Sequence, residues 1–207
     1  MTRIKICGLT REVDVEAAIE AGADAIGFVF YAKSPRAVTP QRARALAKLL
    51  PPFVTPVGLF VNATDAELQA GLEALPNMLL QFHGDETPED CDRVHRPYLR
   101  AARMAPGVDL LDFAARFSNA QAILLDAHVD GYGGGGKVFD WSLVPPSVSS
   151  RLVLSGGLNA ANVADGIARV RPWAVDVSSG VEVSKGIKSA DLIHEFCRAV
   201  RNAEPTR

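Results

Sequence analysis

The sequence is poor in cysteine, with three residues in 207, at Cys7, Cys91 and Cys197. This odd number at wide spacing gives neither a disulfide framework nor a Cys-x-x-Cys pair that would suggest zinc. No cluster of histidines compensates for it, so we expect no metal site. We interpret Cys91 and Cys197 as packing residues, because a free cysteine packs like a small hydrophobic side chain.

An excess of one charge and long apolar runs are also missing. The 22 Lys and Arg residues against 24 Asp and Glu give a net charge of −2, which argues against a nucleic-acid partner. No apolar stretch approaches the roughly 18 residues of a membrane span, and the N-terminal residues lead into a strand pattern rather than a signal-peptide core. We therefore expect a cytoplasmic protein, and 48% hydrophobic residues suffice for one substantial core.

The sequence does contain a regular alternation of short β-branched runs and longer helical segments. Runs such as AIGFVF and RLVLS are apolar almost throughout, which is typical of parallel strands covered on both faces. The predicted strands are Ile4–Cys7, Ala25–Phe30, Pro56–Val61, Leu79–His83, Leu99–Arg103, Ala122–Asp126, Leu152–Ser155 and Ala174–Val177. The predicted helices are Val13–Ala21, Pro40–Leu50, Asp65–Ala74, Pro88–Val94, Asp109–Phe117, Ala160–Ala168 and Ala190–Ala199.

This count predicts an α/β fold, a single-domain (β/α)₈ TIM barrel over residues 1–207. A doubly wound open sheet is the rival, but it favours a GxGxxG turn after the first strand, where this chain has CGLTRE. After the sixth strand, the glycine loop leaves room for only one short helix, WSLV, before Pro145-Pro146. Five residues have the type and position of helix N-caps: Thr39, Thr64, Thr87, Asn159 and Ser189.

Active sites of such barrels lie at the C-terminal ends of the strands, where this chain has a thiol and a carboxyl group. Cys7 and Asp126 end the first and sixth strands, so they would flank one cavity as candidate base and acid. The structural alternatives stay open: Cys7 as a small packing residue, and Asp126 as a capping or ion-pairing carboxylate. His83 ends the fourth strand, where we expect at most a binding contact.

Two glycine loops follow the last two strands, SGGLN and SSG. Barrels of this type often bind phosphate at these loops, through backbone N–H groups and a short extra helix. Tight turns without a ligand are the alternative. The candidate phosphate donors are Gly156, Gly157, Ser178, Ser179 and Gly180.

A candidate carboxylate ligand lies in the loop after the second strand. Arg36 of KSPR has a guanidinium group that can bind a carboxylate through two parallel N–H groups, which neighbouring Lys33 cannot do. The alternative is a solvated loop charge.

Taken together, several motifs resemble the phosphoribosylanthranilate isomerase family of tryptophan biosynthesis, in collinear order from about residue 3 to 200. The resemblance implies an intramolecular isomerase that converts N-(5-phosphoribosyl)anthranilate into 1-(2-carboxyphenylamino)-1-deoxyribulose 5-phosphate, an Amadori rearrangement. It implies a small phosphosugar substrate, no metal and no cofactor; we expect a monomer or a homodimer. The motifs are KICGLT, GADAIGFVFYAKSPR, VGLFVN, QFHGDE, LLDA, GGGGKVFDW, LSGGLN, VDVSSGVE and KGIK.

The resemblance also implies roles for individual residues. Cys7 corresponds to the family's general base, Asp126 to its general acid and Arg36 to the residue that binds the anthranilate carboxylate. The remaining implied contacts are Gly156, Gly157, Ser178 and Ser179 with phosphate, and Asp176 lining the site.

Two further expectations come from the residues themselves. Lys5 lies two positions before Cys7 on the same strand face, so we hypothesise that it favours the thiolate. Gly133–Gly136 are four unbroken glycines where the family usually has a small hydroxyl residue, which predicts a more mobile loop.

Three other functions are weighed against this one. A related ketol-isomerase of histidine biosynthesis has an aspartate at the end of its first strand, where this chain has Cys7. A phosphate-binding barrel without catalysis would have no reason to keep both Cys7 and Asp126. A redox sensor built on Cys7 would need a resolving cysteine, and none is near it in the sequence.

Overall fold

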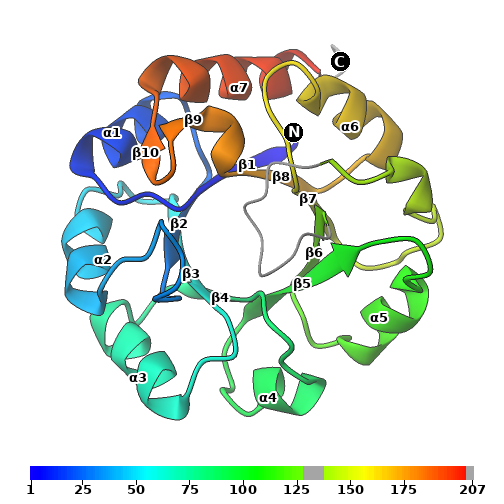
Figure 1. Ribbon diagram of the computed structural model, residues 1–207, viewed down its shortest axis with the longest axis horizontal. Coiled ribbons are helices and arrows are strands. Elements are labelled where there is room, and N and C mark those ends of the chain that lie inside the picture. Colours follow the sequence, from blue (N-terminus) through cyan, green and yellow to red (C-terminus); the bar gives the residue numbers. More distant parts are fainter. Residues whose placement is uncertain (128–137, 204–207) are drawn as a thin grey trace.

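The computed structural model describes residues 1–127 and 138–203, and its centre is a closed barrel of eight parallel strands (Figure 1). Each strand pairs with the next along the chain, and β1 pairs with β8 to close the barrel. The predicted (β/α)₈ fold is confirmed, and the open sheet is excluded; Gly133–Gly136 lie outside the described residues. The strands are β1 Arg3–Cys7, β2 Ala25–Val29, β3 Thr55–Phe60, β4 Leu79–Phe82, β5 Tyr98–Met104, β6 Ala122–Ala127, β7 Leu152–Leu154 and β8 Ala174–Val177.

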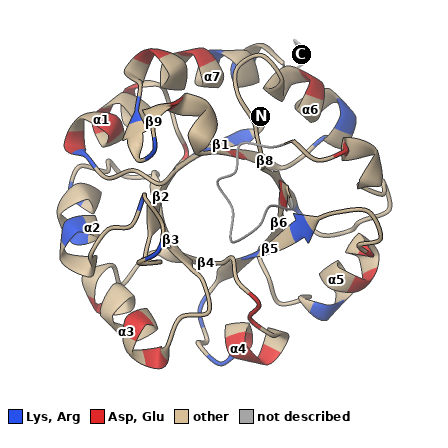
Figure 2. Cartoon of the chain, in the orientation of Figure 1, with Lys and Arg blue, Asp and Glu red and all other residues tan. Residues whose placement is uncertain are grey.

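Helices surround the barrel as a ring, with charged residues of both signs spread around it (Figures 1 and 2). They are α1 Glu12–Glu20, α2 Pro40–Ala47, α3 Asp65–Ala74, α4 Pro88–Asp92, α5 Leu110–Arg116, α6 Val163–Val170 and α7 Ala190–Asn202. Four short elements complete the described chain: the 3₁₀ turns η1 Trp141–Leu143 and η2 Ser179–Val181, and the hairpin strands β9 Glu182–Ser184 and β10 Ile187–Lys188. In the described part of the chain, no helix combines the length and apolar character needed to cross a membrane.

Side-chain caps determine where most of these helices begin. The side chains of Thr39, Thr64, Thr87 and Ser189 each accept a backbone N–H from three residues further on, as predicted. The prediction for Asn159 was wrong. Its side chain accepts the N–H of Ala161 within a turn, and α6 begins only after that turn, at Val163.

The strands present alternate side chains to the helices and to the barrel interior. Ile4 and Ile6 of β1 belong to the large outer core between strands and helices. A separate apolar cluster fills the part of the barrel interior near the N-terminal ends of the strands, and we call it the inner layer. It consists of Val57, Leu99, Ala101, Ala122, Leu124, Val153 and Ala174.

Candidate active site

Buried polar side chains follow the inner layer on the same strand faces. Asp126 comes two residues after Leu124 on β6, and Asp176 two residues after Ala174 on β8. The period of two therefore directs them into the barrel, towards the C-terminal ends of the strands. The buried polar residues of this group are Lys5, Gln81, His83, Asp126, Ser155 and Asp176.

Lys5 and Asp176 form an ion pair inside the barrel. They are neighbours in the register of β1 and β8, with Lys5 Nζ 2.8 Å from Asp176 Oδ1. Ser155 donates its hydroxyl to the second oxygen, Oδ2, at 3.2 Å. Burial lowers the pKa of Lys5, but the Asp176 carboxylate and Cys7 outweigh burial, so this pKa lies above its ordinary value. Lys5 is therefore a permanent cation.

Cys7 is the last residue of β1 and is only 4% exposed. Burial raises the pKa of its thiol and the Asp176 carboxylate adds to this effect, while Lys5 and Lys188 lower it. The net pKa of Cys7 lies above its ordinary value. Lys5 thus acts in the direction that we hypothesised, but its charge is shared with Asp176, a pairing that the sequence did not reveal.

Asp126 is the end of a hydrogen-bonded series of three side chains. The other two are His83, which directly follows β4, and Gln81 within β4. His83 Nε2 lies 2.9 Å from Asp126 Oδ2, and Gln81 Nε2 lies 3.0 Å from His83 Nδ1. Because an amide NH₂ group can only donate, Nδ1 accepts, which leaves Nε2 as the donor of the ring. His83 therefore donates to the carboxylate of Asp126. Sequence reasoning missed Gln81, although its position two residues before His83 places both on one strand face.

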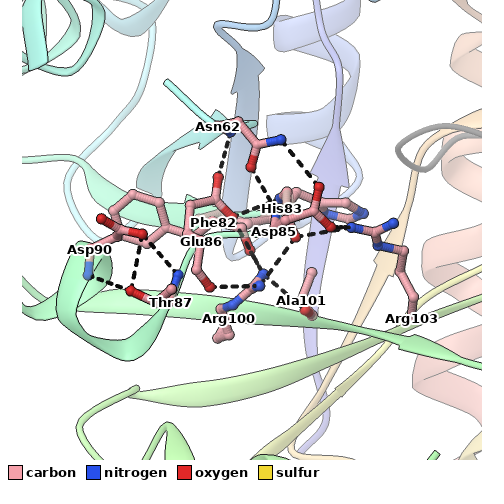
Figure 3. Close-up of polar contacts among 12 residues, drawn as sticks. Asn62, Phe82, His83, Asp85, Glu86, Thr87, Asp90, Arg100, Ala101 and Arg103 are labelled. Atoms are coloured by element: carbon pink, nitrogen blue, oxygen red, sulfur yellow. Dashed lines mark hydrogen bonds and ion pairs between the residues drawn. The ribbon is translucent and has the colours of Figure 1, made fainter. Parts of the chain in front are cut away.

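The backbone on both sides of His83 is held from the neighbouring strand (Figure 3). Arg100 of β5 donates Nη1 to the carbonyl oxygen of Phe82 at 3.0 Å. Its Nη2 donates to the carbonyl oxygens of Gly84 and Glu86, both at 3.1 Å. The carboxylate of Glu86 in turn accepts the Gly84 N–H at 2.8 Å. These bonds fix the direction in which the imidazole leaves the strand.

The two glycine loops lie against each other. A Cβ atom on Gly180 would come within 1.8 Å of the carbonyl oxygen of Leu158, so only glycine permits this approach. The loop after β8 contains the 3₁₀ turn η2, which corresponds to the short extra helix expected there. The loop that contains Gly156 and Gly157 therefore lies next to the loop that contains Ser178, Ser179 and Gly180.

Arg36 is buried, at 7% exposure, and is not a solvated loop charge. Its Nε and Nη2 donate to Oε1 and Oε2 of Glu182 at 2.7 and 2.8 Å. Lys188 donates to the same Oε1 at 2.8 Å and to the carbonyl and hydroxyl oxygens of Ser178 at 2.9 and 3.3 Å. Burial would raise the pKa of Glu182, but Arg36 and Lys188 lower it below its ordinary value. Sequence reasoning missed Glu182 and Lys188 as site residues, although both lie in motifs that carry the resemblance.

The family model for N-(5'phosphoribosyl)anthranilate (PRA) isomerase matches residues 4–199. The chain belongs to this family. The PRA isomerase of Methylibium petroleiphilum is 72% identical over 98% of this chain and 95% of its own length. The crystal structure of the enzyme from Thermotoga maritima has a TM-score of 0.90 at 42% identity and covers 98% of this chain and all of its own. The resemblance inferred from the motifs is confirmed.

A similar structure of a PRA isomerase contains a bound ligand. The ligand is reduced 1-(o-carboxyphenylamino)-1-deoxyribulose 5-phosphate. This structure has a TM-score of 0.87 at 39% identity and covers 98% of this chain and all of its own.

Proposed function

We propose that this member of the PRA isomerase family converts N-(5'-phosphoribosyl)anthranilate into 1-(2-carboxyphenylamino)-1-deoxyribulose 5-phosphate in tryptophan biosynthesis, with Asp126 as general acid and Cys7 as general base. The observation that carries this mechanism is the placement of a buried carboxyl and a buried thiol at the same end of the barrel, next to two groups of anion donors. Acid and base acting on opposite parts of one sugar need this arrangement.

Asp126 acts first. Its carboxylic acid donates a proton to the ribose ring oxygen, the C1–O bond breaks, and the nitrogen lone pair forms the protonated Schiff base. The hydrogen bond from His83 to Oδ2 and that from the Ala127 N–H to Oδ1, at 2.9 and 3.0 Å, orient the carboxyl group for this transfer. Orientation of this kind lowers the entropic cost of proton transfer.

Cys7 acts second. The positive imine acidifies the hydrogen on C2, the thiolate removes that proton, and the C–H electrons form the enolamine. Protonation of C1 and loss of the proton from the C2 hydroxyl group give the ketone product. Because burial raises the pKa of Cys7, the cations Lys5 and Lys188 are needed to keep the thiolate accessible.

The carboxylate and the phosphate at the two ends of the substrate hold it between Asp126 and Cys7. Arg36 binds the anthranilate carboxylate, and the two glycine loops bind the phosphate. His83 and Asp176 line the space between, each already bonded to a partner. Fixing both ends holds the ring oxygen near Asp126 and C2 near Cys7.

The test is turnover of freshly made N-(5'-phosphoribosyl)anthranilate, followed by loss of its fluorescence without added metal or cofactor. We expect Cys7→Ala and Asp126→Asn each to lower kcat by about 10²–10⁴-fold. Cys91→Ala is the matched control, since Cys91 is fully buried outside the site, and it should keep full activity. Full activity in both Cys7→Ala and Asp126→Asn would overturn the mechanism. Turnover of a histidine-pathway phosphosugar but not of this substrate would overturn the function.

A further inference from the structure

One carboxylate joins the two groups of anion donors. Glu182, the first residue of β9, accepts from Arg36 in the loop after β2 and from Lys188 in β10. Its side chain is 5% exposed, and that of Lys188 is fully buried. The mechanism above does not use Glu182. We call Arg36, Glu182, Lys188 and Ser178 the Glu182 bridge.

Glu182 occupies one edge of the Arg36 guanidinium. A guanidinium carries five N–H groups in a plane, and Glu182 takes the edge formed by Nε and one N–H of Nη2. The other edge, formed by Nη1 and the second N–H of Nη2, is a parallel pair that fits another carboxylate. Within residues 1–127 and 138–203, no hydrogen bond engages Nη1. Glu182 therefore orients Arg36 and leaves that edge for a ligand.

Lys188 determines the direction of the Ser178 hydroxyl. The ammonium group donates to Ser178 Oγ at 3.3 Å and to the carbonyl oxygen of the same residue at 2.9 Å. A hydroxyl that already accepts from a cation is left to donate its own proton to another acceptor. A phosphate oxygen on the loop after β8 is such an acceptor. The bridge therefore prepares two donors, one at each end of the site, for two anions.

We propose that Glu182 is a positioning residue that couples the two anion subsites and makes the site specific for a ligand with a carboxylate at one end and a phosphate at the other. The inference rests on the proposed function, because it assigns these anions to Arg36 and Ser178. The bridge contains two cations and one anion, so it still attracts both ends of such a ligand. Glu182→Gln keeps the shape of the side chain, but its NH₂ group cannot accept from Arg36, and the two-bond contact is lost.

The first experiment is a double-mutant cycle on KM for N-(5'-phosphoribosyl)anthranilate. We expect Glu182→Gln to raise KM about tenfold and to leave kcat within about twofold, since the bridge does not touch the reacting atoms. Arg36→Met raises KM as well, and adding Glu182→Gln to it should raise KM by less than it does in the wild type, because the orientation of Arg36 is already lost and only the phosphate end remains to be affected. Asp24→Asn is the matched control: Asp24 pairs with Arg3 and Arg201 away from the mouth, and KM stays unchanged.

The second experiment uses inorganic phosphate as a competitive inhibitor. Glu182→Gln and Lys188→Met should weaken this inhibition severalfold, whereas Arg36→Met should leave it unchanged. Should Glu182→Gln fail to fold, Glu182→Asp keeps the charge but shortens the reach, and it should show the same rise in KM.

The outcomes separate the two proposals. An unchanged KM in Arg36→Met means that the proposed carboxylate contact is wrong, and the inference fails with it. A raised KM in Arg36→Met overturns the inference alone if Glu182→Gln behaves as wild type, or if the two effects multiply in the double variant. Unchanged phosphate inhibition in Glu182→Gln overturns the coupling between the two subsites.

Discussion

The interior of the barrel has two parts, built by the same strands and equally buried but chemically opposite. The inner layer contains only apolar side chains, such as Val57 and Leu124, and it needs no partners. Asp126 and Asp176 lie two residues beyond Leu124 and Ala174, and they and Lys5 of β1 are just as buried. Each of the three makes an ion pair or hydrogen bond. Burial alone therefore does not distinguish core from site. Buried polar groups are what distinguish the site from the core. Replacing them with apolar residues of similar volume would often make the folded protein more stable, so their retention indicates function.

The largest expected effect comes from breaking the Lys5–Asp176 ion pair within the polar part. Lys5→Met leaves the Asp176 carboxylate buried without its cation, which should reduce the free energy of unfolding by about 3–5 kcal/mol. It also removes a cation that lowers the pKa of Cys7, so this pKa rises further. Since the base acts as thiolate, the rising limb of kcat/KM against pH should move to higher pH. Denaturant unfolding and the pH–rate profile measure the two effects.

A double variant separates stability from ionisation. Lys5→Met with Asp176→Leu removes both buried charges and should recover most of the lost stability. Its pH–rate profile should lie between those of wild type and Lys5→Met, because Lys5 affects the pKa of Cys7 more strongly than Asp176 does. An unchanged pH–rate profile in Lys5→Met would mean that Lys5 does not affect the ionisation of Cys7.

A cavity in the inner layer should affect stability alone. Leu124→Ala removes a fully buried side chain and should cost about 2–5 kcal/mol in the free energy of unfolding. Leu125→Ala, at the next position and facing the outer core, is the matched control with a loss in the same range. Both should keep the wild-type pH–rate profile at a temperature where they remain folded. A shifted profile in Leu124→Ala would show that the two parts of the interior are coupled.

A smaller effect is expected at the boundary between strand and mouth. Gly8 follows Cys7 with φ at +77°, and a Cβ there would lie 2.6 Å from Arg36 Cδ and 3.2 Å from Ser178 Oγ. Gly8→Ala should cost about 1–2 kcal/mol of backbone strain and push both anion donors outwards. We expect KM to rise severalfold while kcat changes less. A lower kcat at unchanged KM would mean that the substitution displaces Cys7 instead.

The sequence predicted what depends on local patterns. Short apolar, β-branched runs placed Cys7 and Asp126 at the ends of strands, and residue type placed the cap at Thr39. Pairings between distant residues were not predictable. Lys5 and Asp176 are 171 positions apart, and Arg36 and Glu182 are 146 apart. Such contacts depend on barrel closure and on side-chain rotamers, which leave no local signal. The failed cap at Asn159 is similar, since a turn competed for the same side chain.

The smallest expected effect tests whether activity depends only on residues that line the barrel interior, or also on residues outside it at the same end of the strands. Thr64 caps α3 after β3, and its hydroxyl accepts the Glu67 N–H while the Glu67 carboxylate accepts the Thr64 N–H. Thr64→Ala breaks this capping box and should cost about 1 kcal/mol in stability. The loss should appear in thermal unfolding, with kcat and KM unchanged, because Thr64 does not line the barrel interior. Thr64→Ser keeps the hydroxyl and should retain most of the stability. If Thr64→Ala lowered kcat, the start of α3 would also contribute to catalysis. The residues that line the barrel interior would then not be sufficient to explain the activity.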